Sequence, residues 1–163
     1  MMEWSTILEA IGLAQTGDRA AGRQALLACW EQTAPADHGQ RCVLAHYLAD
    51  VQDSVDDEVG WDATALSEYA HLRDDDLVAV GIPDAAGLAP SLHLNLGDGF
   101  LRQGRVADAS EQLRAGLASV DALGDDGYGR MIREALVGLA ERLEARPDVG
   151  RPMSSRHGTG QQS

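Results

Sequence analysis

The spacing of apolar residues constrains the fold of this chain more than any other feature of its sequence. Apolar side chains recur at steps of three and four over most of the length, as in Trp4, Ile7, Leu8 and Ile11. Such steps place the side chains on one face of an α-helix. No stretch of the sequence alternates apolar and polar residues in the manner of a β-strand. The pattern therefore predicts an all-α protein.

Turn-forming residues divide this pattern into about seven helices. Gly17, Pro35 and Gly104 each interrupt a periodic stretch, because glycine favours helix ends and proline cannot continue a helix. Short turns between helices favour antiparallel neighbours. We predict one helical domain over 1–146 and a disordered, polar tail over 147–163. Within the domain we expect hairpins at about 2–33, 36–72 and 91–123, a connector at 73–90 with a short helical turn at Leu77–Val80, and a capping helix at 128–145.

The composition bears on the packing of the core and on the kinds of molecule that the chain can bind. Aromatic residues make up only 4% of the chain, so Leu, Ala, Val and Ile must fill the core, which suits closely packed helices. The formal net charge of −13 argues against nucleic acid and against an anionic membrane surface, since both require clustered Lys and Arg. A cationic partner is compatible with this charge, and so is plain solubility.

The sequence also indicates a cytoplasmic protein. It contains neither a secretory leader at its N-terminus nor an apolar run of about 18 residues, the length of a membrane span. Cys29 and Cys42 lie among apolar neighbours, and we interpret them as reduced core thiols. Trp61 is interpreted as an aromatic residue packed between hairpins, with an exposed anchor for a partner as the alternative. All 13 basic residues are Arg, which is typical of a high-GC bacterial genome.

A set of residues in the C-terminal half of the chain has the spacing of a tetratricopeptide repeat, which this segment resembles. The set comprises Leu96-Gly97, Phe100, Gly104, Ala109, Leu113 and Gly116-Leu117. Ala10 and Ala45 take the place of Gly97 in two more degenerate hairpins, and these two alanines are 35 residues apart, close to the family period of about 34. The resemblance implies stacked antiparallel hairpins in a short right-handed superhelix.

The same resemblance implies a concave groove lined by the first helix of each hairpin. Tetratricopeptide proteins generally bind extended peptides or partner surfaces there. The lysines that complete the carboxylate clamp of some members are absent here, so a segment containing Arg or Lys suits the lining better. Transferred to this sequence, the lining comprises Gln15, His46, Asp50, Asp53, Leu94, Asn95, Asp98 and Arg102.

Alternatives remain for several of these residues. His46, Asp50 and Asp53 follow one another at steps of four and three, and they form a solvated face, a surface for a cationic partner, or metal ligands. A small-molecule or metal site would also recruit His93 and Asp98. Asp98 and Arg102 have the order and spacing of a structural helix pair. A self-assembling homodimer is a third hypothesis.

The chain lacks recognisable catalytic motifs. Its glycine-rich run at 124–129 does not have the phosphate-loop pattern, and the acidic run at 53–58 lacks the spacing of a calcium loop. There is no nucleophile elbow, no His-Glu-x-x-His and no cysteine pair at zinc spacing. We therefore predict a protein-interaction module rather than an enzyme, with no catalytic residue, cofactor or metal.

Overall fold

The computed structural model describes residues 1–146, and over this range it is built of α-helices without a β-strand. The prediction of an all-α fold of seven helices in antiparallel hairpins is confirmed for these residues. The predicted tail at 147–163 lies outside the described residues. The α-helices are α1 (Trp4–Gln15), α2 (Arg19–Gln32), α3 (His38–Asp50), α4 (Val55–Tyr69), α5 (Ala89–Arg102), α6 (Val106–Ala118) and α7 (Gly127–Glu144), with 3-10 helices η1 (Val78–Val80), η2 (Ala85–Leu88) and η3 (Val120–Ala122).

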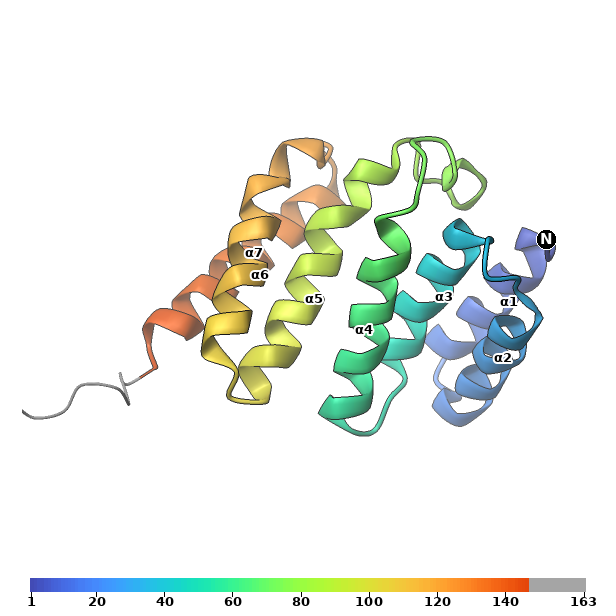
Figure 1. The fold of residues 1–163 in the computed structure, drawn as a ribbon, viewed down its shortest axis with the longest axis horizontal. Coiled ribbons are helices and arrows are strands. Elements are labelled where there is room, and N and C mark those ends of the chain that lie inside the picture. The colour runs from blue at the N-terminus through green and yellow to red at the C-terminus, as the bar shows by residue number, and fades with distance from the viewer. Residues whose placement is uncertain (147–163) are drawn as a thin grey trace, which may run out of the picture.

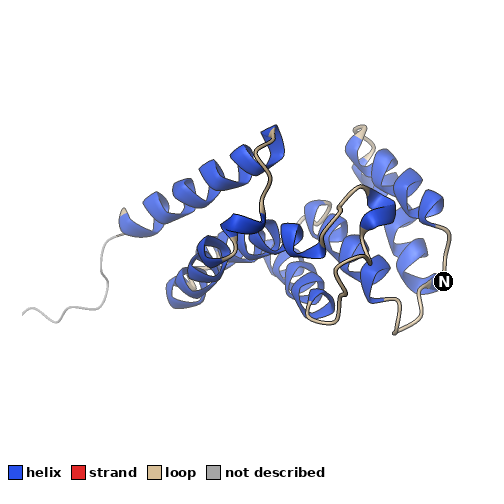
Figure 2. Cartoon of the chain, turned by 90° about the horizontal axis from the view of Figure 1, so that it is seen from above, coloured by secondary structure: helices blue, strands red, loops and turns tan. Residues whose placement is uncertain are grey.

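The helices stack side by side in chain order (Figure 1). The most extensive contacts join α1 to α2, α3 to α4, and α5 to α6, and α4 packs on α5 between the second and third hairpins. Helix α7 contacts both α5 and α6. Seen from above, α7 and the N-terminal helices stand at opposite ends of an arch whose middle is formed by the other helices (Figure 2). None of the described helices combines the length and the apolar character that crossing a membrane requires.

Two glycines form the tight turns of the first and third hairpins. Gly17 and Gly104 have φ angles of 108° and 78°, in the left-handed region that glycine adopts without strain. After α5, the Gly104 N–H donates to the Leu101 carbonyl and the Arg105 N–H donates to the Phe100 carbonyl, at 3.0 and 2.9 Å. These two bonds satisfy carbonyl groups that the helix end would otherwise leave unpaired.

The connector between the second and third hairpins is packed rather than loose. Leu77 is fully buried, and Ala85 and Leu88 are nearly so, within the core built by α1–α4. The expected helical turn is η1. Helix α5 begins at Ala89 instead of Ser91, because Pro90 occupies the first turn, where its missing N–H costs nothing.

The cysteine and tryptophan interpretations agree with the packing. Cys29 and Cys42 are buried free thiols, and burial raises the pKa of Cys42 to about 12. The Trp61 ring meets the Trp30 ring edge to face at a centroid distance of 5.0 Å, and both pack against the core. Trp61 therefore joins α4 to α2.

Close approach of helices in the third hairpin depends on Gly97. A Cβ atom at this position would lie 3.0 Å from Leu139 Cδ2, 3.2 Å from Gln112 Cβ and 3.5 Å from the Ala109 carbonyl oxygen. These atoms belong to α7 and α6, so Gly97 sets the spacing of three helices.

We expect Gly97→Leu to lower the free energy of unfolding by a few kcal/mol, because a larger side chain overpacks this junction. Gly60→Leu is the matched control, since nothing lies within 4 Å of a Cβ at Gly60. It should leave stability unchanged or raise it slightly, as glycine is a poor helix former. Chemical denaturation measures both variants, and equal stabilities would contradict this account of the packing.

Candidate binding groove

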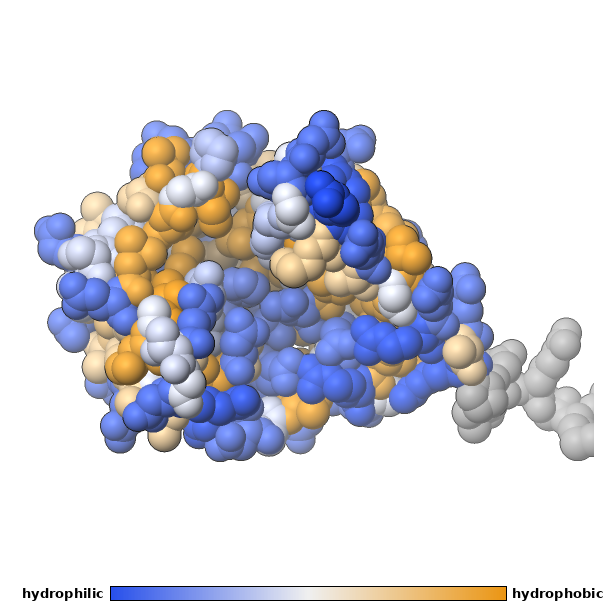
Figure 3. All heavy atoms as spheres, turned by 180° about the vertical axis from the view of Figure 1, so that it is seen from behind, coloured by the Kyte–Doolittle hydropathy of each residue, from blue (hydrophilic) through white to orange (hydrophobic). Residues whose placement is uncertain are grey.

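The concave side of the arch contains a polar cavity of about 380 Å³ between α3, α4, α5 and α7. Figure 3 views the molecule from this side and shows a hollow with apolar and polar side chains on different parts of its surface. The cavity is lined by Asp50, Glu58, Leu94, Asn95, Asp98, Ala135, Gly138 and Arg142. Four of the predicted groove residues therefore converge here: Asp50, Leu94, Asn95 and Asp98.

Most of the carboxylates in this cavity are paired with arginines. Asp98 lies 2.8 Å from Arg102 Nε and 2.6 Å from Arg142 Nη1. Arg102 also donates to Glu58, with Nη1 3.0 Å from Oε2. The hydrogen bond to Glu58 is the main cause that raises the pKa of Arg102. The predicted Asp98–Arg102 pair is thus present, and Arg102 acts by holding two lining carboxylates.

Asp50 differs from the other carboxylates of the cavity. Within residues 1–146 its side chain makes no hydrogen bond and no ion pair, although it is exposed at the end of α3. Loss of hydration against the groove wall raises the pKa of Asp50, and the nearby Glu58 carboxylate adds to this, while His46 opposes it. The Asn95 amide likewise has no partner in the described part of the chain. Asp50 and Asn95 are therefore available to a ligand.

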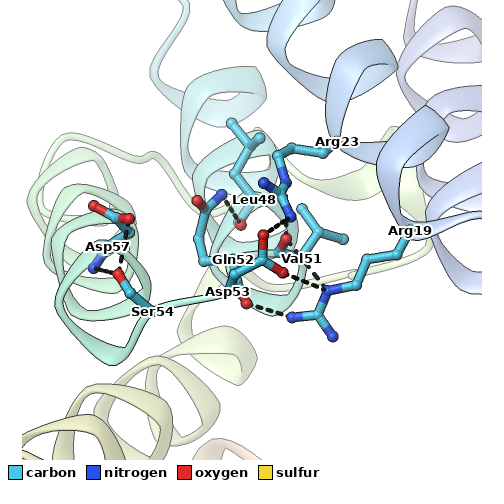
Figure 4. A network of polar contacts seen from close by, with 8 residues as sticks. All are labelled: Arg19, Arg23, Leu48, Val51, Gln52, Asp53, Ser54 and Asp57. Atoms are coloured by element: carbon cyan, nitrogen blue, oxygen red, sulfur yellow. Dashed lines mark hydrogen bonds and ion pairs between the residues drawn. The ribbon is translucent and has the colours of Figure 1, made fainter.

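Two predicted groove residues lie elsewhere. Helix α3 ends at Asp50, so Asp53 follows the helix instead of extending its face. Its carboxylate lies 2.7 Å from Arg23 Nη2 of α2, and this hydrogen bond is the main cause that lowers the pKa of Asp53. Figure 4 shows the contact between the two side chains. Gln15 is exposed at the end of α1 and lines neither this cavity nor the one described next. The prediction of one face containing His46, Asp50 and Asp53 is wrong.

His46 and its neighbour Tyr47 line a second, more apolar cavity of about 500 Å³. The Nδ1 atom of His46 is buried and has no hydrogen-bond partner within the described residues. Burial lowers the pKa of His46, despite the opposing effect of Asp50. This imidazole is therefore neutral at pH 7.

The metal alternative finds no supporting geometry. His93 Nδ1 lies 2.8 Å from Gln112 Oε1, a contact between α5 and α6. Across residues 1–146, no group of three or more His, Cys, Asp or Glu side chains is arranged to hold a metal ion. The five residues suggested for a metal site do not converge on one point. Asp50 and Asp98 line the first cavity, His46 lines the second, Asp53 pairs with Arg23, and His93 contacts Gln112.

Asp62 is a residue of this region that sequence reasoning missed. Its side chain is only 2% exposed, and its Oδ1 atom has no hydrogen-bond partner among the described residues. Burial, together with the charges of Glu58, Asp50 and Asp98 and against the effect of Arg102, raises the pKa of Asp62 to about 8. The signal was present in the sequence, because Asp62 stands on the apolar face between Val59 and Leu66.

The exposed apolar residues of α7 do not form one stripe. Met131 and Val137 are 55% and 54% exposed, but six residues of helix separate them by about 120° around the axis. The homodimer hypothesis therefore gains no continuous apolar face from α7.

No family model, curated protein or solved structure matches this chain. Membership of the tetratricopeptide family thus stays a prediction, and function must be argued from the groove itself.

We expect Asp62 to make stability depend on pH. Its pKa is about 8 in the folded chain and 3.8 ordinarily, so the unfolded state ionises first as pH rises. The free energy of unfolding should therefore fall between about pH 4 and pH 8 by up to a few kcal/mol. Asp62→Asn should remove this component, as measured by denaturation at a series of pH values.

Asp75 is exposed, so the Asp75→Asn variant is the control for the loss of one negative charge. It should retain the wild-type slope. An Asp62→Asn variant with the same pH dependence as the wild type would show that the Asp62 carboxyl is not the titrating group.

Proposed function

We propose that this chain binds an extended segment of another protein in its concave groove, and that a Lys or Arg of this segment pairs with Asp50. The observation that supports the proposal is the state of the groove carboxylates. Glu58 and Asp98 are paired with Arg102 and Arg142, whereas Asp50 lines the same cavity without a cationic partner. A ligand cation would supply the missing partner.

The neighbouring polar groups suit a peptide. The Asn95 amide can both donate and accept, so it can pair with the peptide groups of an extended segment. Asn95 also stands where the tetratricopeptide resemblance implies a backbone-holding asparagine. The ion pairs of Arg102 and Arg142 hold the other two carboxylates of the groove in place, which favours a ligand in one orientation.

The charge of the whole chain supports the same partner class. A net charge of −13 attracts a cationic segment and accelerates its encounter with the groove. A single exposed ion pair contributes only about 0.2–1 kcal/mol, so the proposed pair fixes specificity and orientation more than affinity. Two buried free cysteines suit a reducing compartment such as the bacterial cytoplasm, which is the proposed setting.

Selection from a library of displayed random peptides tests the proposal. We expect enrichment of Lys or Arg, and dissociation constants about two- to fivefold higher for Asp50→Asn than for the wild type, which corresponds to at most about 1 kcal/mol. The difference should shrink at high salt, because screening weakens the pair. Fluorescence anisotropy with the selected peptides measures these affinities.

Asp75→Asn serves as the matched control, since it removes one exposed carboxylate far along the chain from this cavity. Its affinities should equal those of the wild type. Selected peptides without Lys or Arg, or equal losses in both variants, would refute a specific role for Asp50.

A further inference from the structure

The second cavity, beside His46, is not used by the proposed ion pair. Its volume of about 500 Å³ falls within the range of about 300–1,000 Å³ that is usual for ligand sites. Its walls come from α1, α3, the packed connector, and the segment that joins α6 to α7. Apolar side chains such as Leu8, Ile11, Val43 and Ile82 form much of this lining, and the two rings of Tyr47 and Tyr128 accompany them.

One side chain of this lining, the imidazole of His46, can form hydrogen bonds with a ligand. His46 Nδ1 is buried and unpartnered within the described residues, and a buried polar atom in this state costs about 1–3 kcal/mol. A neutral imidazole donates a hydrogen bond from one ring nitrogen and accepts one at the other, according to its tautomer. The carboxylates at the cavity, Asp84 and Asp126, already cap helices through the N–H groups of Ala86 and Gly129.

The position of His46 relative to Asp50 sets the spacing of a ligand that uses both. The two residues are one turn apart on α3, so their Cβ atoms are about 5–6 Å apart. In an extended peptide, alternate side chains point to the same side and are about 6.6 Å apart. Two ligand residues separated by one other therefore match the two positions.

We infer that the cavity beside His46 binds a Tyr or Trp side chain that stands two residues from the cation paired with Asp50. This inference rests on the proposed function, because it names a second anchor of the same bound segment. An aromatic ring fills the apolar cavity and meets the Tyr47 and Tyr128 rings, while its O–H or N–H group reaches His46. Burying the ring supplies the affinity that one exposed ion pair lacks.

A variant that fills the cavity tests the anchor directly. Ala122 is exposed and lines the cavity, whereas Ala118 is exposed and lines neither cavity. With a selected peptide of the pattern aromatic-x-Arg, Ala122→Trp should raise the dissociation constant at least about tenfold, and Ala118→Trp should leave it unchanged. Thermal denaturation confirms that both variants are folded.

The role of His46 has a separate readout. The wild type should bind a Tyr-x-Arg peptide about three- to tenfold more tightly than its Phe-x-Arg counterpart, the effect of one hydrogen bond. His46→Phe should abolish this preference and leave the loss caused by Asp50→Asn in place. A preference that persists in His46→Phe would contradict the proposed hydrogen bond.

The outcomes separate this inference from the proposed function. If Asp50→Asn weakens binding but Ala122→Trp does not, the aromatic anchor is wrong and the peptide-binding groove stands. If neither variant weakens binding, both proposals fail. If free p-cresol binds the chain as tightly as the Tyr-x-Arg peptide, the cavity holds a small aromatic molecule instead of a peptide side chain, which also overturns the inference.

Discussion

The groove depends on the contact between α4 and α5, which joins the first two hairpins to the rest of the chain. Val59 occupies the space that a side chain at Gly99 would need, since a Cβ there would lie 2.6 Å from Val59 Cγ2. Beside this apolar contact, Arg102 of α5 pairs with Glu58 of α4. This close packing of α4 on α5 brings Asn95 to the same cavity as Asp50.

The groove is built at a cost in stability. Asp50 and Asp62 both have pKa values raised by loss of hydration, so the fold disfavours their ionised forms. Asp62 is buried near the cavity, and the charges of three lining carboxylates contribute to its raised pKa. A chain selected for stability alone would place an apolar residue at this position. Because the Asp62 carboxyl is mostly protonated at pH 7, it adds little negative charge to the surroundings of Asp50.

Sequence reasoning was most successful where the information is local. Helical periodicity and turn residues predicted the all-α fold and its hairpins, and the repeat spacing named Asn95 and Asp98, which line one cavity. It failed for Asp53, because helical steps were extended past the end of α3. Glu58 and Arg142 were missed because they reach the cavity from α4 and α7, and the packing between hairpins cannot be read from the spacing within one.

The orientation of His46 shows a further limit of sequence reasoning. Its sequence position next to Asp50 suggests one polar face, yet the two side chains line cavities of opposite character. An acidic cavity alone would attract many cationic segments weakly, and an apolar cavity alone would accept many hydrophobic groups. A ligand that occupies both must present a cation and a ring at one spacing, so their adjacency on α3 provides the selectivity that neither cavity has alone.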